Sequence, residues 1–168
     1  NINNGKVLWK YFLKKNYQNF YVNSATRLGG CNPWGGISAD TKNKIVYIST
    51  GNAQPDYFGK NRPGLNKYCN SIIALDIKNK KKLFDFQEIS HDVWNKDLAS
   101  PPILGNLKIN NKFIDIVIGL SKTGNILLLD RYQGSPVFDM RYRLGESEDN
   151  KNKYYLDLEK PQPLENFE

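Results

Sequence analysis

The chain has 168 residues, of which 39% are hydrophobic and 24% are charged, and its formal net charge at pH 7 is +7. This is the composition of an ordinary globular protein, and no apolar run approaches the ~20 residues that a membrane-spanning helix needs. The positive charge comes mostly from lysines dispersed among asparagines, as in residues 78–82. A nucleic-acid surface would interleave basic residues with exposed aromatics, so we expect no nucleic-acid partner.

Short β-strands are predicted along the whole chain, and no window of 11 or more residues shows a helical period. Runs rich in aliphatic or aromatic residues occur, in chain order, at residues 45–49, 71–75, 82–86, 114–118 and 126–129. Turn-forming sequences separate them at residues 40–44, 76–80, 122–124 and 131–134. This alternation predicts an all-β fold of short strands and tight turns.

A repeat of the form D-x3-G-x3-W/F recurs along the chain. It matches at Asp130, at Asp76 with Lys in place of Gly, and at Asn1 with Asn in place of Asp. The Asp can accept hydrogen bonds from the N–H groups of the turn, and Gly tolerates a positive φ. The aromatic that follows, such as Phe84 or Phe138, can pack against a neighbouring sheet. The copies at Asp76 and Asp130 are separated by about the length of one four-stranded propeller blade.

The predicted architecture is therefore a partial β-propeller of two to three four-stranded blades over residues 1–140. A polar loop or tail over residues 141–168 would lead to the next blade. A propeller needs about 4–8 blades to close its ring, so we expect a piece of a larger ring without the signal or anchor segment. The isolated piece would expose unpaired sheet edges, which favours self-association.

The loops between the repeats carry a distinctive series of motifs. In chain order they are NPWGG at 32–36, TGN at 50–52, PDYFG at 55–59, RPG at 62–64, FQ at 86–87, HDVWNKDL at 91–98, KTGN at 122–125 and LDR at 129–131. This series resembles the quinoprotein dehydrogenases, particularly the branch that includes the membrane-bound glucose dehydrogenases. These are eight-bladed propellers that carry pyrroloquinoline quinone (PQQ) and oxidise alcohols or aldoses. The resemblance implies a periplasmic enzyme with Ca²⁺ beside PQQ and with ubiquinone or a cytochrome as electron acceptor.

The resemblance also implies roles for individual residues. Trp34 would form one wall of the PQQ site by stacking on the flat quinone, with Asn32 of the same loop also binding the cofactor. Asn52 would be an oxygen ligand of Ca²⁺. Lys122 would contact the quinone oxygens, where a fixed positive charge stabilises the charge that develops on hydride transfer.

Asn95 departs from the family pattern, because the residue after the motif's Trp is usually the Asp that accepts the substrate proton. A neutral amide cannot accept that proton as a carboxylate does. Asp97 would share a face with position 95 if the segment is extended, and so could substitute as the catalytic base. The alternative is that catalysis has been lost and the chain is a non-catalytic propeller, acting as a binding or assembly scaffold. His91 and Asp92 are expected to lock this loop rather than to react.

Two cysteines, Cys31 and Cys69, make neither a disulfide framework nor a metal site. They could pair if the fold brings them together, but their spacing does not decide this. Two separate buried thiols are the slightly favoured prediction.

Overall fold

All the secondary structure is β-strand in the computed structural model, which describes residues 1–12, 29–60 and 62–138. The strands are β1 (Gly29–Gly30), β2 (Ile37–Asp40), β3 (Ile45–Ser49), β4 (Ala53–Gln54), β5 (Ser71–Asp76), β6 (Lys81–Gln87), β7 (Ile103–Ile109), β8 (Lys112–Leu120) and β9 (Ile126–Asp130). No helix long and apolar enough to span a membrane occurs in these described segments. The predicted all-β fold is confirmed, whereas the predicted tail over 141–168 lies outside the described residues.

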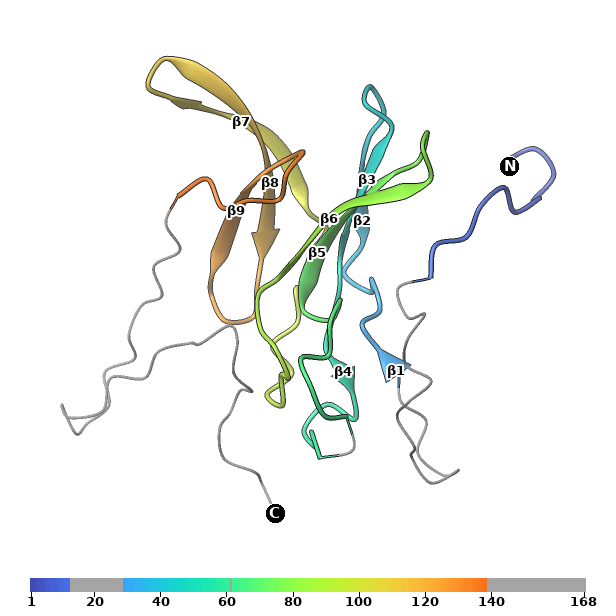
Figure 1. The fold of residues 1–168 in the computed structure, drawn as a ribbon, viewed down its shortest axis with the longest axis vertical. Coiled ribbons are helices and arrows are strands. Elements are labelled where there is room, and N and C mark those ends of the chain that lie inside the picture. The colour runs from blue at the N-terminus through green and yellow to red at the C-terminus, as the bar shows by residue number, and fades with distance from the viewer. Residues whose placement is uncertain (13–28, 61, 139–168) are drawn as a thin grey trace.

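The strands form two larger antiparallel sheets (Figure 1). The first sheet has four strands in the order β2-β3-β5-β6, and the second has three in the order β7-β8-β9. Beyond β9, the chain turns back and makes an isolated antiparallel bridge between Leu129 and Pro136. A short antiparallel pair of β1 and β4 lies below the first sheet in the view of Figure 1. One complete blade and most of a second are therefore present.

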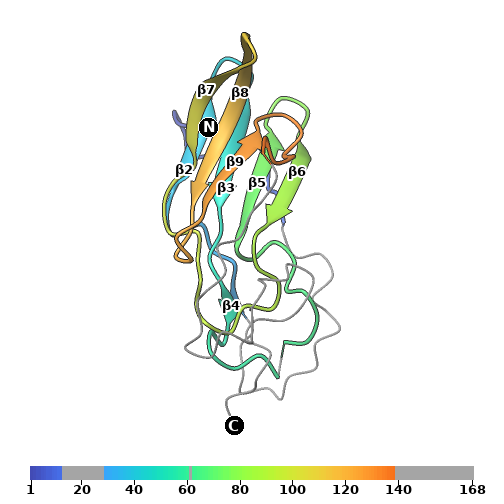
Figure 2. The same ribbon diagram turned by 90° about the vertical axis from the view of Figure 1, so that its left-hand side faces the viewer.

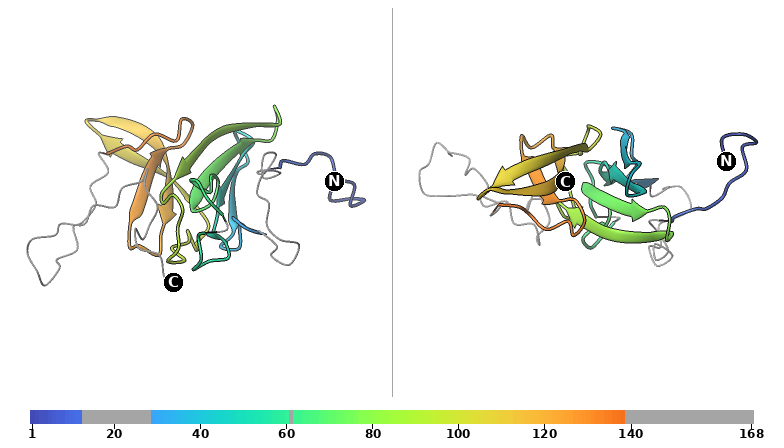
Figure 3. Two further views of the ribbon diagram at one scale, coloured as in Figure 1. Left: turned by 60° about the horizontal axis from the view of Figure 1, so that its bottom comes forward. Right: turned by 90° about the horizontal axis from the view of Figure 1, so that it is seen from above.

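The core lies between the two sheets, which stand next to one another when viewed from the side (Figure 2) and from above (Figure 3). Buried side chains of the first sheet meet buried side chains of the second sheet and of the loop that precedes it. The cluster consists of Ile45, Tyr47, Ile72, Ala74, Phe84, Leu98, Val117, Leu127 and Leu129. The approach is close at Gly119, where an added Cβ would lie 2.5 Å from Ile72 Cδ1. Apolar burial between the sheets therefore holds the two blades together.

The repeat works as its sequence predicts. The Asp130 carboxylate accepts hydrogen bonds from the N–H groups of Tyr132 and Gln133, each at 2.8 Å. Gly134 has a φ of 73°, a left-handed conformation that glycine adopts without steric cost. Phe84 is buried, and its ring lies where a Cβ on Gly134 would stand. The aromatic of one copy therefore packs on the turn of the next, although Phe138 of the last copy is half exposed.

The two cysteines form a disulfide, Cys31–Cys69, so the slight preference for separate thiols was wrong. The reason is that the strand before β2 and the loop before β5 both contact residues 51–53. Cys31 N–H donates to the Asn52 carbonyl at 2.7 Å, and Asn70 N–H donates to the Gly51 carbonyl at 3.0 Å. These main-chain bonds bring two residues 38 positions apart to a Cα–Cα distance of 4.3 Å.

We expect Cys69→Ser to lower the free energy of unfolding by about 3 kcal/mol, because the disulfide restricts the unfolded chain. Urea unfolding of the full-length protein, with and without reductant, measures this. Reductant should bring the wild type to the midpoint of the variant and leave the variant unchanged. An identical midpoint for the oxidised wild type and Cys69→Ser would contradict the expectation.

Candidate functional site

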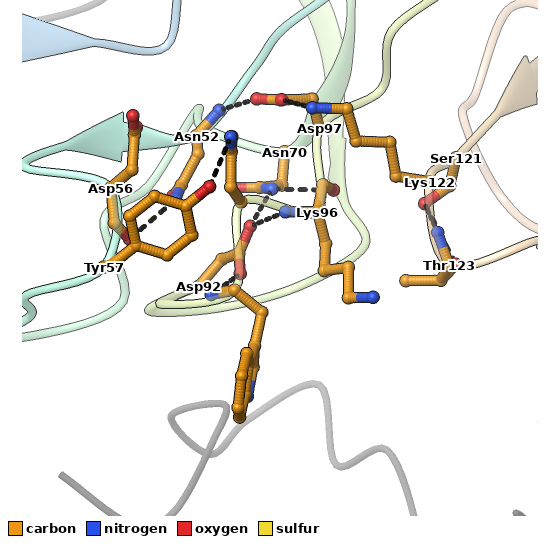
Figure 4. Close-up of polar contacts among 12 residues, drawn as sticks. Asn52, Asp56, Tyr57, Asn70, Asp92, Lys96, Asp97, Ser121, Lys122 and Thr123 are labelled. Atoms are coloured by element: carbon orange, nitrogen blue, oxygen red, sulfur yellow. Dashed lines mark hydrogen bonds and ion pairs between the residues drawn. The ribbon is translucent and has the colours of Figure 1, made fainter. Parts of the chain in front are cut away.

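Side chains from several loops of both sheets meet in one region (Figure 4). These loops are residues 29–36 before β2, residues 50–52 after β3, residues 91–98 between β6 and β7, and the β8–β9 turn at 121–125. Main-chain hydrogen bonds join them directly. Gly51 N–H donates to the Asn32 carbonyl at 3.1 Å, and Lys122 N–H donates to the Asp97 carbonyl at 3.1 Å. Residues that are far apart in the sequence therefore share one site.

Asp97 lies at the centre of this site and is buried. One carboxylate oxygen accepts the backbone N–H of Asn52, and the other forms an ion pair with the Lys122 ammonium. The same ammonium lies 5.4 Å from the centroid of the Trp34 ring, within the range of a cation–π contact. The structure thus brings together four of the predicted site residues, namely Trp34, Asn52, Asp97 and Lys122. Asn32 adjoins them through its main chain, and its side chain is exposed.

Trp34 is 59% exposed, but the Nε1 edge of its indole packs against Gly51. Gly51 makes this position possible. A Cβ built at Gly51 would lie 2.6 Å from Trp34 Nε1 and 2.6 Å from an oxygen of Asp97. Gly35, which follows Trp34, is packed as tightly: a Cβ built there would lie 2.6 Å from the Ala99 carbonyl carbon and would also collide. The indole is therefore positioned by close packing of backbone.

Gly51→Ala should push the Trp34 indole and the Asp97 carboxylate apart. Overpacking of this kind costs about 1–3 kcal/mol of unfolding free energy. Urea unfolding, together with the emission maximum of the tryptophans, would detect both the loss of stability and the displaced ring. The matched control is Gly105→Ala in β7, where the added methyl would make ordinary contacts with Ile116. Equal midpoints for the two variants would contradict the steric account.

Asn95 does not lie in an extended segment, because its φ is 56°. The condition under which Asp97 would share a face with position 95, an extended segment, is therefore not met. The cause is a tight turn, in which Asp92 accepts the N–H groups of both Trp94 and Lys96, at 2.8 and 2.6 Å. Asn tolerates the left-handed conformation that this turn requires. Asn95 Nδ2 donates to the Tyr57 hydroxyl at 3.4 Å. The Asp97 carboxylate instead contacts Asn52 and Lys122.

The dipeptide His91-Asp92 holds the loop in place, as expected from the sequence. Besides the two turn N–H groups, the buried Asp92 carboxylate accepts a hydrogen bond from Asn70 Nδ2 at 2.7 Å. Burial raises the pKa of Asp92, although these hydrogen bonds act in the opposite direction. His91 Nδ1 lies 2.8 Å from the Gly64 carbonyl oxygen, which joins the loop to the RPG segment.

Arg62, in the RPG motif, has a structural role that the sequence did not reveal. Its side chain is 1% exposed, and it donates to main-chain carbonyls from two loops and to one amide side chain. The acceptors are the carbonyls of Pro55, Asp56 and Asp92 and Oδ1 of Asn66. A planar guanidinium can satisfy all four with fixed geometry. Arg62 therefore ties the PDYFG loop to the HDVW loop.

Glu88 is a second residue that sequence reasoning missed. It follows β6, is fully buried, and accepts hydrogen bonds from Thr123 Oγ1 and Asn125 Nδ2, each at 2.8 Å. Burial raises the pKa of Glu88 above its ordinary value of 4.5, and the hydrogen bonds from the turn offset only part of this. The only sequence signal was an acidic residue two positions after the predicted strand at 82–86.

The raised pKa of Glu88 predicts a pH dependence of stability. The folded protein favours the protonated carboxyl, so the free energy of unfolding should fall as the pH rises from about 4.5 through the higher folded pKa. Glu88→Gln removes this contribution and should flatten the decline. Urea unfolding at a series of pH values between 4 and 8 would measure both slopes. Parallel curves for the wild type and Glu88→Gln would contradict the prediction.

The described residues provide only one predicted metal ligand. The Asn52 oxygen Oδ1 accepts the N–H of Ala53 at 2.7 Å, and Nδ2 donates to the Asp56 carbonyl at 3.1 Å. The amide oxygen keeps a second lone pair with which it could bind a cation. Within residues 1–12, 29–60 and 62–138, no three His, Cys, Asp or Glu side chains group together as a metal site would require.

Comparisons with known proteins agree on one family. The family described as "PQQ: Glucose/ethanol/alcohol dehydrogenase, beta-propeller domain" matches residues 1–165. The quinoprotein glucose dehydrogenase of Escherichia coli is 31% identical over 145 residues, which are 81% of this chain and 18% of that protein. Quinoprotein glucose dehydrogenase A of Acinetobacter calcoaceticus is 33% identical over 140 residues, with the same coverage of 81% and 18%. The chain thus spans about a fifth of the length of these relatives.

Solved structures agree with the fold. The quinohemoprotein alcohol dehydrogenase of Comamonas testosteroni superposes with a TM-score of 0.59 at 32% identity, covering 65% of this chain and 17% of that one. A europium-containing methanol dehydrogenase gives a TM-score of 0.60 at 25% identity, covering 66% and 19%. The predicted fold class, part of a β-propeller of this type, is confirmed.

Proposed function

Because this chain belongs to the PQQ glucose/ethanol/alcohol dehydrogenase β-propeller family, we propose that it forms part of the cofactor pocket of a dehydrogenase. The full-length protein would oxidise an alcohol or an aldose by hydride transfer to PQQ. The observation that carries this proposal is the cluster of Trp34, Lys122 and Asp97, in which an ammonium lies between an indole ring and a buried carboxylate. A plain propeller blade needs no such arrangement.

The chemistry of this cluster fits the cofactor. PQQ is flat and anionic, and it would supply the quinone that accepts hydride from the substrate. Trp34 offers an exposed aromatic ring on which a flat ligand can stack at little cost in side-chain entropy. Lys122 is 39% exposed in its side chain, so its ammonium can contact a ligand above the ring while it remains paired with Asp97. The pocket thus combines a stacking surface with a cation.

The side chains of this chain would divide the catalytic work. Lys122 would stabilise negative charge on the quinone oxygens, because a preorganised cation needs no reorientation when charge develops. Asp97 would accept the hydroxyl proton of the substrate, since it is the carboxylate of the cluster and the amide of Asn95 has no basic oxygen of comparable strength. Asn52 would contribute one oxygen to Ca²⁺, with the other ligands supplied by the rest of the propeller.

The site requires a re-oxidation partner, for which we propose ubiquinone or a cytochrome. We also propose a periplasmic location for the full-length protein. These two proposals rest on membership of the family and on the named bacterial relatives, among which are quinoprotein and quinohemoprotein dehydrogenases.

The direct test is reconstitution of the full-length protein with PQQ and Ca²⁺, followed by assays on alcohols and aldoses with an artificial electron acceptor. We expect turnover of at least one substrate class that depends on added PQQ. Complete inactivity on all substrates, with PQQ demonstrably bound, would overturn the proposal of catalysis.

One observation favours a second candidate function. Position 95 carries an amide, and this amide interacts with the Tyr57 hydroxyl rather than with a carboxylate partner. A propeller that had lost catalysis and served as a binding scaffold would have this property. It would show no change in absorbance or melting temperature on addition of PQQ, whereas the dehydrogenase should show both.

A further inference from the structure

The turn that presents Lys122 has little apolar packing of its own. None of the residues from Ser121 to Ile126 is buried, and Ile126 is 64% exposed. Inside the turn, Thr123 N–H donates to Ser121 Oγ at 3.1 Å, and Asn125 N–H donates to Thr123 Oγ1 at 3.3 Å. These local bonds shape the turn but do not fix its place relative to the first sheet.

Contacts from other segments must therefore set the position of the turn. One is made by Asp97, through the Lys122 ammonium and the Lys122 N–H. The other is made by Glu88, whose Oε1 accepts both Thr123 Oγ1 and Asn125 Nδ2 at 2.8 Å. Glu88 directly follows β6, so this pair of hydrogen bonds joins the first sheet to the β8–β9 turn. Figure 4 shows Thr123 and Lys122 on the same turn, opposite Asp97.

Glu88 is an unusual choice for a purely structural acceptor. The residue is fully buried, and its second oxygen, Oε2, has no hydrogen-bond partner within the described segments. A buried carboxyl with one unpartnered oxygen is costly, so a position with only a packing role would favour an apolar side chain. Both bonds that Glu88 makes lie within three residues of Lys122. Its contacts serve the placement of this lysine.

We propose that Glu88 is a positioning residue, which sets the location of the Lys122 ammonium over the Trp34 ring by holding Thr123 and Asn125. The role of Lys122 toward the quinone rests on the proposed function. The positioning itself does not, and it can be measured without the cofactor. Glu88→Gln keeps the Oε1 acceptor and should preserve the position of Lys122, whereas Glu88→Ala removes the acceptor and should release the turn.

The first measurement is hydrogen exchange in the cofactor-free, full-length protein. The N–H of Lys122 donates to the Asp97 carbonyl and that of Gly124 to the Ser121 carbonyl, so the peptide spanning residues 120–126 reports on opening of the turn. We expect exchange there to rise about tenfold in Glu88→Ala and to stay at the wild-type rate in Glu88→Gln. The control for general destabilisation is Ile45→Ala at the far end of the first sheet, which should leave this peptide unchanged. Equal exchange in Glu88→Ala and the wild type would overturn the proposal.

The second measurement separates kcat from the affinity for PQQ in the reconstituted enzyme. Glu88→Ala should weaken PQQ binding and lower kcat, each by about tenfold, while Glu88→Gln restores both. Loss of both parameters in Ile45→Ala as well would show a merely structural effect and would overturn the proposal. A wild type that binds no PQQ would instead overturn the proposed function, whatever the exchange rates of the variants.

Discussion

Asp97→Asn should lower kcat for the alcohol or aldose substrate by about 10²–10⁴, the usual contribution of a general base. The amide still offers an oxygen to the Asn52 N–H, so the local fold should persist. It lacks the negative charge that pairs with Lys122, and it cannot take up the substrate proton. Steady-state kinetics of the PQQ-reconstituted full-length protein would measure this loss.

A control variant separates a role in catalysis from a role in folding. Asp130→Asn, in a turn at the opposite end of the second sheet, should retain wild-type kcat, because an Asn also accepts the turn N–H groups. An Asp97→Asn enzyme with unchanged kcat would exclude Asp97 as the base.

Arg62→Met should destabilise the protein by about 3–5 kcal/mol, one of the largest effects expected of any substitution in this chain, because each buried acceptor left without its donor costs about 1–3 kcal/mol. The guanidinium donates to three main-chain carbonyls and to Asn66 Oδ1, and a thioether can donate to none of them. The Asp56 carbonyl keeps its hydrogen bond from Asn52 Nδ2, but the other three acceptors lose the bond that the guanidinium supplied. The urea midpoint of the cofactor-free protein would measure the loss.

Matched substitutions isolate the geometry of this contact. Arg62→Lys keeps the charge but cannot fork, so we expect it to recover less than half of the loss. Lys60→Met at an exposed neighbouring position should change stability by no more than about 0.5 kcal/mol. An Arg62→Met midpoint equal to that of Lys60→Met would contradict the assigned role of Arg62.

The strands that could be predicted were those with a strong local signal. Residues 45–49 and 71–75 are rich in β-branched residues and follow or precede an Asp turn, and they correspond to β3 and β5. The prediction missed β2, whose sequence ISAD has little β-propensity, and β7, in which Gly105 and Asn106 interrupt the apolar pattern. Both are paired by their neighbours in the sheet, which no local pattern reveals.

The candidate site could be predicted only through the resemblance of its loops to a known family. Trp34, Asp97 and Lys122 belong to separate loops, and nothing in their spacing places them together. The roles of Arg62 and Glu88 were not predicted, because charged residues are seldom buried unless paired, and their partners appear only when the chain is folded. The turn at Asn95 was missed for a related reason, since Asp92 forms it by accepting two backbone N–H groups.

The most direct test of the proposed cofactor pocket is a titration of PQQ into the cofactor-free, full-length protein in the presence of Ca²⁺. Tryptophan fluorescence and calorimetry would monitor binding during the titration. We predict binding with a dissociation constant of about a micromolar or tighter, and a loss of at least about tenfold in affinity for Trp34→Leu and for Lys122→Ala. Absence of binding, or an affinity unchanged by both substitutions, would contradict the account.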